Sequence, residues 1–102
     1  MPTVEDALIY MGIDYVDDVV TKNATRALAT AKQTLLGAVG DDLEKYLPED
    51  PRAVELVLIY TDDLYSNRGV SAKVSGATRQ LVHVMELQLE LDLRKKREAA
   101  QA

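Results

Sequence analysis

The three prolines of this 102-residue chain stand at positions 2, 48 and 51. Proline removes a backbone donor and clashes with the preceding helical turn, so it rarely lies inside a helix. Long helices can therefore run without a proline break on either side of 48–51. The core must be built from Leu, Val, Ile and Ala, because the chain has five Tyr but neither Phe nor Trp. Such side chains suit helix-on-helix packing, and we expect an all-α fold.

The apolar spacing predicts a small bundle of about four helices in one domain, residues 1–102, with a long C-terminal helix or an extended tail. Thr3 and Asp6 have the spacing of a capping box, and Gly12 is a natural stop for the first helix. Asp50 followed by Pro51 is typical of a helix start. The expected helices cover 4–11, 20–39, 51–66 and a segment from about 77, with one or two helical turns or a loop at 41–47.

Two of these helices are expected to pack closely. The helix at 20–39 has a stripe of mostly small residues at helical spacing, namely Ala24, Ala27, Leu28, Ala31, Leu35 and Ala38. Small side chains let a neighbour approach, so this helix should be central. The helix at 51–66 is apolar nearly all round and should be buried; its apolar residues are Ala53, Val54, Val57, Leu58, Tyr60 and Leu64.

The last segment permits two interpretations. Residues 85–93 alternate apolar and polar side chains, the period of a half-buried strand, yet they are mostly good helix formers. On a helix, Leu81, Val82, Met85, Leu89 and Leu93 make one stripe, and Val84, Leu87 and Leu91 make a second, roughly opposite one. We interpret the segment as a helix whose second face another subunit covers. A strand would instead add to a partner's sheet edge, so both interpretations imply a partner.

The segment 60–69 ends the third helix with tyrosines followed by Asn, Arg and Gly. Tyr and Arg are enriched in interface hot spots, which makes Tyr60, Tyr65, Asn67 and Arg68 candidates for an intersubunit contact. In the alternative interpretation the tyrosines cap the core, and Arg68 donates hydrogen bonds to the last carbonyls of its helix.

The sequence nominates no catalytic residue, cofactor site or metal site. His83 is the one histidine, and no nucleophile or carboxylate is nominated as its partner. The chain has no cysteine, which excludes thiolate chemistry. The acidic pairs at 17–18, 41–42 and 62–63 lack the alternating spacing of oxygen-ligand loops. We expect a protein that is not an enzyme and needs no cofactor.

The charge is uneven along the chain, whose net charge is −5. Residues 1–50 carry ten acids and four bases, and residues 51–102 carry seven acids and eight bases. An acidic half disfavours tight nucleic-acid binding as the main role. The basic cluster Arg94, Lys95, Lys96 and Arg97 can contact DNA or an acidic protein surface; alternatively, it supplies favourable charge at a helix C-terminus before a flexible tail, with 94–102 as the tail. No apolar run is long enough to span a bilayer.

In the order of its elements the chain resembles the small head–tail connector (adaptor) proteins of long-tailed bacteriophages. The resemblance rests on a short first helix with an acidic connector, a central helix ending in the acidic turn 40–47, and a Pro-led apolar helix. That helix ends in Tyr60 and, at 65–68, Tyr-Ser-Asn-Arg, and a loop and a final helix with an Arg-rich end follow. The last segment departs from the family pattern, because no Pro precedes it and it is longer.

The resemblance implies a homo-oligomeric ring, commonly of twelve copies, under the portal protein at the virion neck. Such a ring is assembled in the host cytoplasm, lengthens the channel through which double-stranded DNA passes without specific binding, and supports stopper or tail-completion proteins. A ring needs a heterologous interface, for which Leu87, Leu91 and the basic cluster are candidates, and the C-terminal segment is the candidate for reaching the portal. The alternative is a small helical regulatory module that binds protein or DNA.

Overall fold

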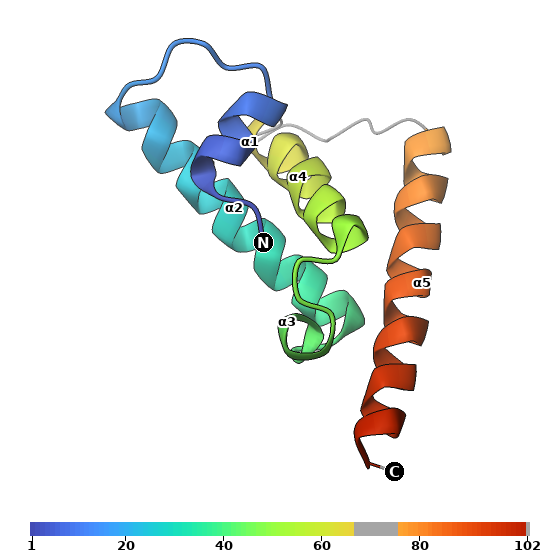
Figure 1. Cartoon of the computed structure of the whole chain (residues 1–102). Helices are drawn as coiled ribbons and strands as arrows, with labels where there is room; N and C mark the ends of the chain where they lie inside the picture. Colours follow the sequence, from blue (N-terminus) through green and yellow to red (C-terminus); the bar gives the residue numbers. More distant parts are fainter. Residues whose placement is uncertain (67–75, 102) are drawn as a thin grey trace.

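The computed structural model describes residues 1–66 and 76–101 as a bundle of helices, and this part of the chain contains no strand (Figure 1). The helices are α1 (Val4–Tyr10), α2 (Asp18–Val39), α3 (Leu43–Tyr46), α4 (Pro51–Ser66) and α5 (Gly76–Gln101). The expected all-α bundle is thus confirmed. Residues 85–93, which also had the pattern of a strand, lie in the middle of the long helix α5.

Helix α1 is defined at both ends by its local sequence. The Asp6 amide donates to the Thr3 hydroxyl over 3.1 Å, and the Thr3 amide donates to the Asp6 carboxylate over 2.9 Å. This is the capping box predicted from the spacing. At the other end Gly12 has φ 71°, and the amides of Gly12 and Ile13 donate back to carbonyls of the last turn. Such a Schellman arrangement stops a helix and turns the chain away.

The long helices α2 and α4 each begin at an aspartate cap. The Asp17 carboxylate accepts a hydrogen bond from the Val20 amide over 2.8 Å, so α2 begins two residues earlier than expected. The Asp50 carboxylate accepts from the Arg52 amide over 2.9 Å, and Pro51 occupies the first helical position as predicted. These caps satisfy amides that the first helical turn would otherwise leave unpaired.

Helix α2 is central, because α1, α4 and α5 all pack against it. Its small buried residues allow α4 to approach closely; these are Ala24, Ala27 and Ala31. The predicted stripe was wrong at its end, since Ala38 is exposed and Val39 is buried. The reason is the helical repeat of about 3.6 residues, which brings the residue four positions after Leu35 back to the buried face.

The expectation that α4 is buried nearly all round was wrong for its C-terminal half. Leu56 and Val57 are completely buried, but Leu64 remains 39% exposed. Leu64 lies in a surface depression beside polar side chains of α2, which do not cover it. The polar residues of that depression are Asn23, Arg26 and Thr30.

Helix α5 packs through one face against the ends of α2, α3 and α4 (Figure 1). Leu89 and Leu93 have no exposed surface, and Val82 and Met85 pack partly buried against the same core. The core cluster combines residues of four helices: Leu28, Ala31, Leu35, Val39, Leu43, Ala53, Leu56, Val57, Leu89 and Leu93.

Gly40 allows this close packing. Its φ of 141° is one that L side chains rarely adopt. A Cβ atom at this position would also collide with the Arg97 side chain and would lie 2.9 Å from Leu93 Cδ2. The end of α2 therefore needs glycine both for its backbone conformation and for the approach of α5.

We expect Leu89→Ala to lower the free energy of unfolding by about 2–5 kcal/mol, because it leaves a cavity in the core. Leu87→Ala makes the same chemical change on the exposed face of the same helix and should change stability by no more than about 0.5 kcal/mol. Urea unfolding at low micromolar concentration measures both. Equal losses for the two variants would contradict the one-sided packing of α5.

Candidate functional site

The outer face of α5 carries exposed apolar side chains, which we call the α5 stripe: Val84, Leu87 and Leu91. They are between 44% and 50% exposed. Leu81, which the sequence placed in the stripe with Leu89 and Leu93, is 55% exposed, so that placement was wrong; it lies about 80° around the helix from Leu89, at the edge of the buried face. At 100° per residue, Val84, Leu87 and Leu91 lie opposite Leu89 and Leu93 on the helix. The structure thus brings together Leu87 and Leu91, the two interface candidates predicted from the second stripe, and leaves them uncovered.

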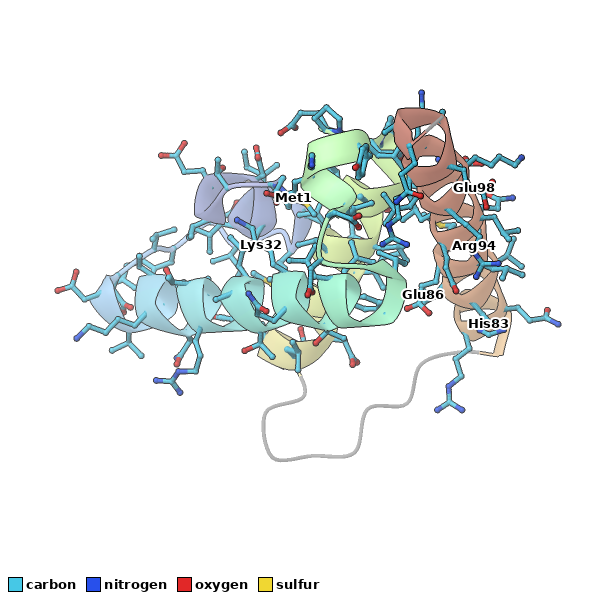
Figure 2. All side chains as sticks on the ribbon, turned by 90° about the horizontal axis from the view of Figure 1, so that it is seen from below. Met1, Lys32, His83, Glu86, Arg94 and Glu98 are labelled. Carbon is cyan, nitrogen blue, oxygen red and sulfur yellow. The ribbon has the colours of Figure 1, made fainter. Side chains whose placement is uncertain are left out.

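The basic cluster at 94–97 is divided between two faces of α5. Arg94, Lys95 and Lys96 are exposed, and Arg94 forms an ion pair with Glu90 at 3.5 Å on the surface. Figure 2 shows Arg94 and Glu98 on the side of α5 that is turned away from α2. At 100° per residue, Arg94 and Lys95 lie on the two flanks of the α5 stripe, whereas Lys96 lies on the side of Leu89 and Arg97 points inward.

Arg97 binds Asp42 at the turn between α2 and α3. Its Nε donates to Asp42 Oδ2 over 2.6 Å, and its Nη2 donates to Oδ1 over 2.5 Å. These hydrogen bonds lower the pKa of Asp42 and raise that of Arg97. Residues 94–101 form the last turns of α5, where the sequence suggested the start of a flexible tail. The flexibility of this end stays a prediction.

A second arginine links α5 to the start of α4. Arg52 Nη1 lies 2.9 Å from Asp92 Oδ2, and Arg52 Nη2 lies 2.9 Å from Asp50 Oδ2. Hydrogen bonds from Arg52 lower the pKa of Asp50. Together with Leu89, Leu93 and the bond between Arg97 and Asp42, this link holds the C-terminal half of α5 in one orientation on the core.

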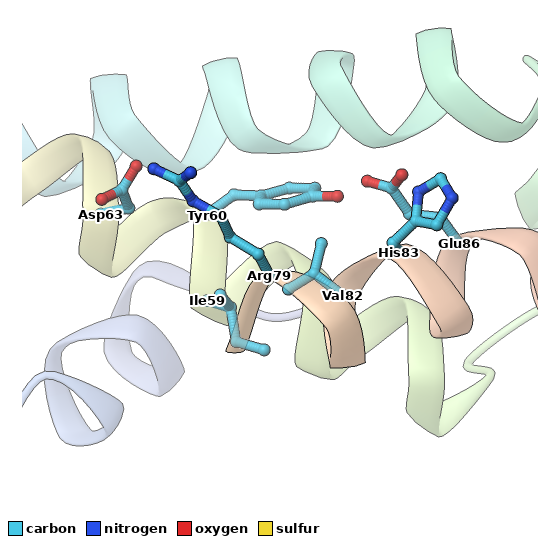
Figure 3. A pocket seen from close by; sticks show the side chains of 7 residues that line it. All are labelled: Ile59, Tyr60, Asp63, Arg79, Val82, His83 and Glu86. Carbon is cyan, nitrogen blue, oxygen red and sulfur yellow. The ribbon is translucent and has the colours of Figure 1, made fainter. Parts of the chain in front are cut away.

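A pocket of about 250 Å³ separates the C-terminal half of α4 from the N-terminal half of α5 (Figure 3). Its lining consists of Ile59, Tyr60, Asp63, Arg79, Val82, His83 and Glu86. The Tyr60 ring lies along the pocket, and its hydroxyl is directed toward Glu86 and His83 (Figure 3). This hydroxyl is buried and has no hydrogen-bond partner among the described residues. Burial also raises the pKa of Glu86.

The remaining sequence candidates are Tyr65, Asn67 and Arg68. Tyr65 is partly buried in the last turn of α4. Asn67 and Arg68 lie outside the described residues, so their proposed contacts stay predictions. Within 1–66 and 76–101 no group of three His, Cys, Asp or Glu side chains could hold a metal ion. In the same part of the chain, no helix has both the length and the apolar character that crossing a membrane requires.

Sequence reasoning missed a second exposed apolar surface, which we call the acidic edge: Tyr15, Val16 and Val19. These side chains are between 48% and 77% exposed. They lie in the connector and at the start of α2, among the exposed residues Asp14, Asp17 and Asp18. The connector was noted for its acids alone, although the apolar residues between them were an available signal.

Exposed apolar side chains flanked by charge are typical of surfaces that contact other macromolecules. Comparisons of the chain with models of protein families, with curated proteins and with solved structures find no match. The function is therefore inferred from these surfaces and from the sequence.

We expect Asp42→Asn to be less stable than the wild type at pH 7. Because Arg97 holds the folded pKa of Asp42 below its ordinary value of 3.8, the carboxylate stabilises the fold above about that pH. This stabilisation is lost as the pH falls through the folded pKa. Urea unfolding between pH 7 and pH 3 should show the difference from wild type shrinking on the acid side. Asp41→Asn, at the exposed neighbouring position, is the control. An equal loss of stability in this variant at pH 7 would show that pairing with Arg97 is not the cause.

We expect Tyr60→Phe to raise the free energy of unfolding by about 1 kcal/mol, since it removes a buried hydroxyl that lacks a partner. Tyr15→Phe, on an exposed side chain, should leave stability within about 0.5 kcal/mol of the wild type. Chemical denaturation of the two variants is the measurement. A clear loss of stability in Tyr60→Phe would mean that the hydroxyl forms a hydrogen bond in solution.

Proposed function

We propose that this chain is a structural subunit that assembles with further copies of itself into a ring at the neck of a long-tailed bacteriophage. The ring joins the portal protein to the stopper or tail-completion proteins and continues the DNA channel. The observation that supports this most directly is the second apolar face of α5, because the fold uses one face for its core and leaves the α5 stripe uncovered.

The α5 stripe is presented on a helix that is already held in place. Leu89 and Leu93 bury the opposite face, and ion pairs of Arg52 and Arg97 hold the C-terminal half. Binding through a preorganised surface costs less conformational entropy than binding through a mobile one. A rigid apolar helix face supports a role in lasting assembly.

The resemblance to head–tail connectors provides the biological setting, a virion protein that is assembled in the host cytoplasm. The residues that carry it include the acidic connector and the Pro-led helix that ends at Ser66. A channel protein benefits from carboxylates on its surface, since negative charge lets double-stranded DNA pass without adhering. The net charge of −5 is of this sign.

A second candidate function is a small regulatory module that binds protein or DNA. The exposed cations Arg94, Lys95 and Lys96 at one end of the molecule favour it. Such a module would be a monomer or dimer, and its affinity for DNA would fall steeply with salt. The size of the particle in solution and in the presence of portal protein separates this function from the ring.

We expect Leu87→Asp combined with Leu91→Asp to weaken ring formation or portal binding by about tenfold or more, because two carboxylates would have to be desolvated in the interface. Light scattering and native mass spectrometry, of the chain alone and mixed with portal protein, measure the effect. Circular dichroism should show an unchanged helical fold.

Ala29→Asp combined with Gln33→Asp is the matched control, since it adds the same two charges, four residues apart, to exposed positions of α2. This variant should assemble like the wild type. A wild-type chain that remains a monomer or dimer, both alone and with portal protein, would contradict the ring.

A further inference from the structure

The two exposed apolar surfaces lie on opposite sides of the molecule. The acidic edge is formed by the connector and the start of α2, whereas the α5 stripe is on the far face of α5. Figures 1 and 2 show the connector and α5 at opposite sides in two perpendicular views. One copy can therefore use both surfaces at the same time, each with a different neighbour.

Each surface is fixed by the fold. The acidic edge covers the connector after the Schellman stop at Gly12 and the first residues after the helix cap at Asp17. The α5 stripe is supported from behind by Leu89 and Leu93. Both surfaces thus present large apolar side chains from positions that the backbone holds in place, as preorganised binding surfaces do.

The charges beside the two surfaces are of opposite sign. Residues 1–19 contain five acids and neither Lys nor Arg, and the carboxylates of Asp14, Asp17 and Asp18 are exposed around the acidic edge. Exposed Arg94 and Lys95 lie on the two flanks of the α5 stripe, with exposed Glu98 between them. Contact between two acidic edges would bring like charges together, which is unfavourable, whereas contact between an edge and a stripe pairs opposite charges.

We infer that the acidic edge of one copy docks on the α5 stripe of the next copy. The contact is heterologous, so each subunit offers one surface to each neighbour, and the chain of contacts closes into a ring if the rotation between copies allows it. This inference rests on the proposed function for its biological setting, but the head-to-tail contact itself is a separate, testable property.

Disulfide trapping tests the contact against a clean background, because the chain has no cysteine of its own. Val16→Cys and Leu91→Cys are prepared separately with tags of different mass, mixed under mild oxidation and analysed by non-reducing electrophoresis. We expect the mixed dimer to exceed the statistical share of about half of all dimers and to form about tenfold faster than with the control pair Gln33→Cys and Leu91→Cys. A mixed dimer at the control rate, or a product dominated by Leu91→Cys joined to itself, would overturn the inference.

Complementation between blocked variants provides a second readout. Tyr15→Asp with Val19→Asp blocks the acidic edge, and Leu87→Asp with Leu91→Asp blocks the α5 stripe. Each variant alone should remain monomeric, but the mixture should form dimers and nothing larger, because one intact edge and one intact stripe remain. Circular dichroism confirms that both variants are folded. A mixture that stays monomeric contradicts the head-to-tail contact.

Different results would contradict the ring function and the head-to-tail contact. If wild-type rings form but neither trapping nor complementation succeeds, the ring stands and the pairing of these surfaces is wrong. If trapping and complementation succeed but the wild type forms no ring, alone or on portal protein, the head-to-tail contact stands and the neck function is wrong.

Discussion

The packing of α5 against the end of α2 is the contact on which the arrangement of this molecule depends. Leu89 and Leu93 are completely buried there, and Gly40 lets the two backbones approach. The bond between Arg97 and Asp42 completes the contact with a charged hydrogen bond to the turn after α2. One face of α5 is thereby buried in the core, and the opposite face is exposed.

The burial of one face of α5 determines which side chains remain exposed on the other. Leu87 and Leu91 would be ordinary core candidates in a larger protein, but no element of the described chain covers them. Tyr60, for which the sequence left open an interface contact and a cap on the core, lies along a pocket between α4 and α5. Two arginines, Arg52 and Arg97, act within the fold, while the cations around Arg94 remain at the surface. The structure thus distinguishes the residues that hold α5 on the core from the exposed residues on its outer face.

Local signals predicted the elements well. The capping box at Thr3, the stop at Gly12 and the start at Pro51 were all identified from the sequence, because caps and stops depend on residues within a few positions of one another. The errors concern which side chains of a helix face the core. Val39 takes the buried place expected for Ala38, and Leu64 stays exposed, because burial depends on which neighbouring helix covers each residue. The acidic edge was missed for a different reason, because the connector was considered for its acids alone and not for the apolar residues between them.

The sequence alone was sufficient for the helical class, for most helix boundaries and for the two apolar faces of the last helix, since these follow from periodicity and from short-range hydrogen bonding. The sequence favoured the second face, with Leu87 and Leu91, as the one left for a partner, but what the first face packs against could not be predicted from it. The tertiary contacts decided it. The face with Leu89 and Leu93 packs against Gly40 at the end of α2. Beside it, Arg97 pairs with Asp42, which is 55 residues away in the sequence. Such long-range pairings form only when the helices pack.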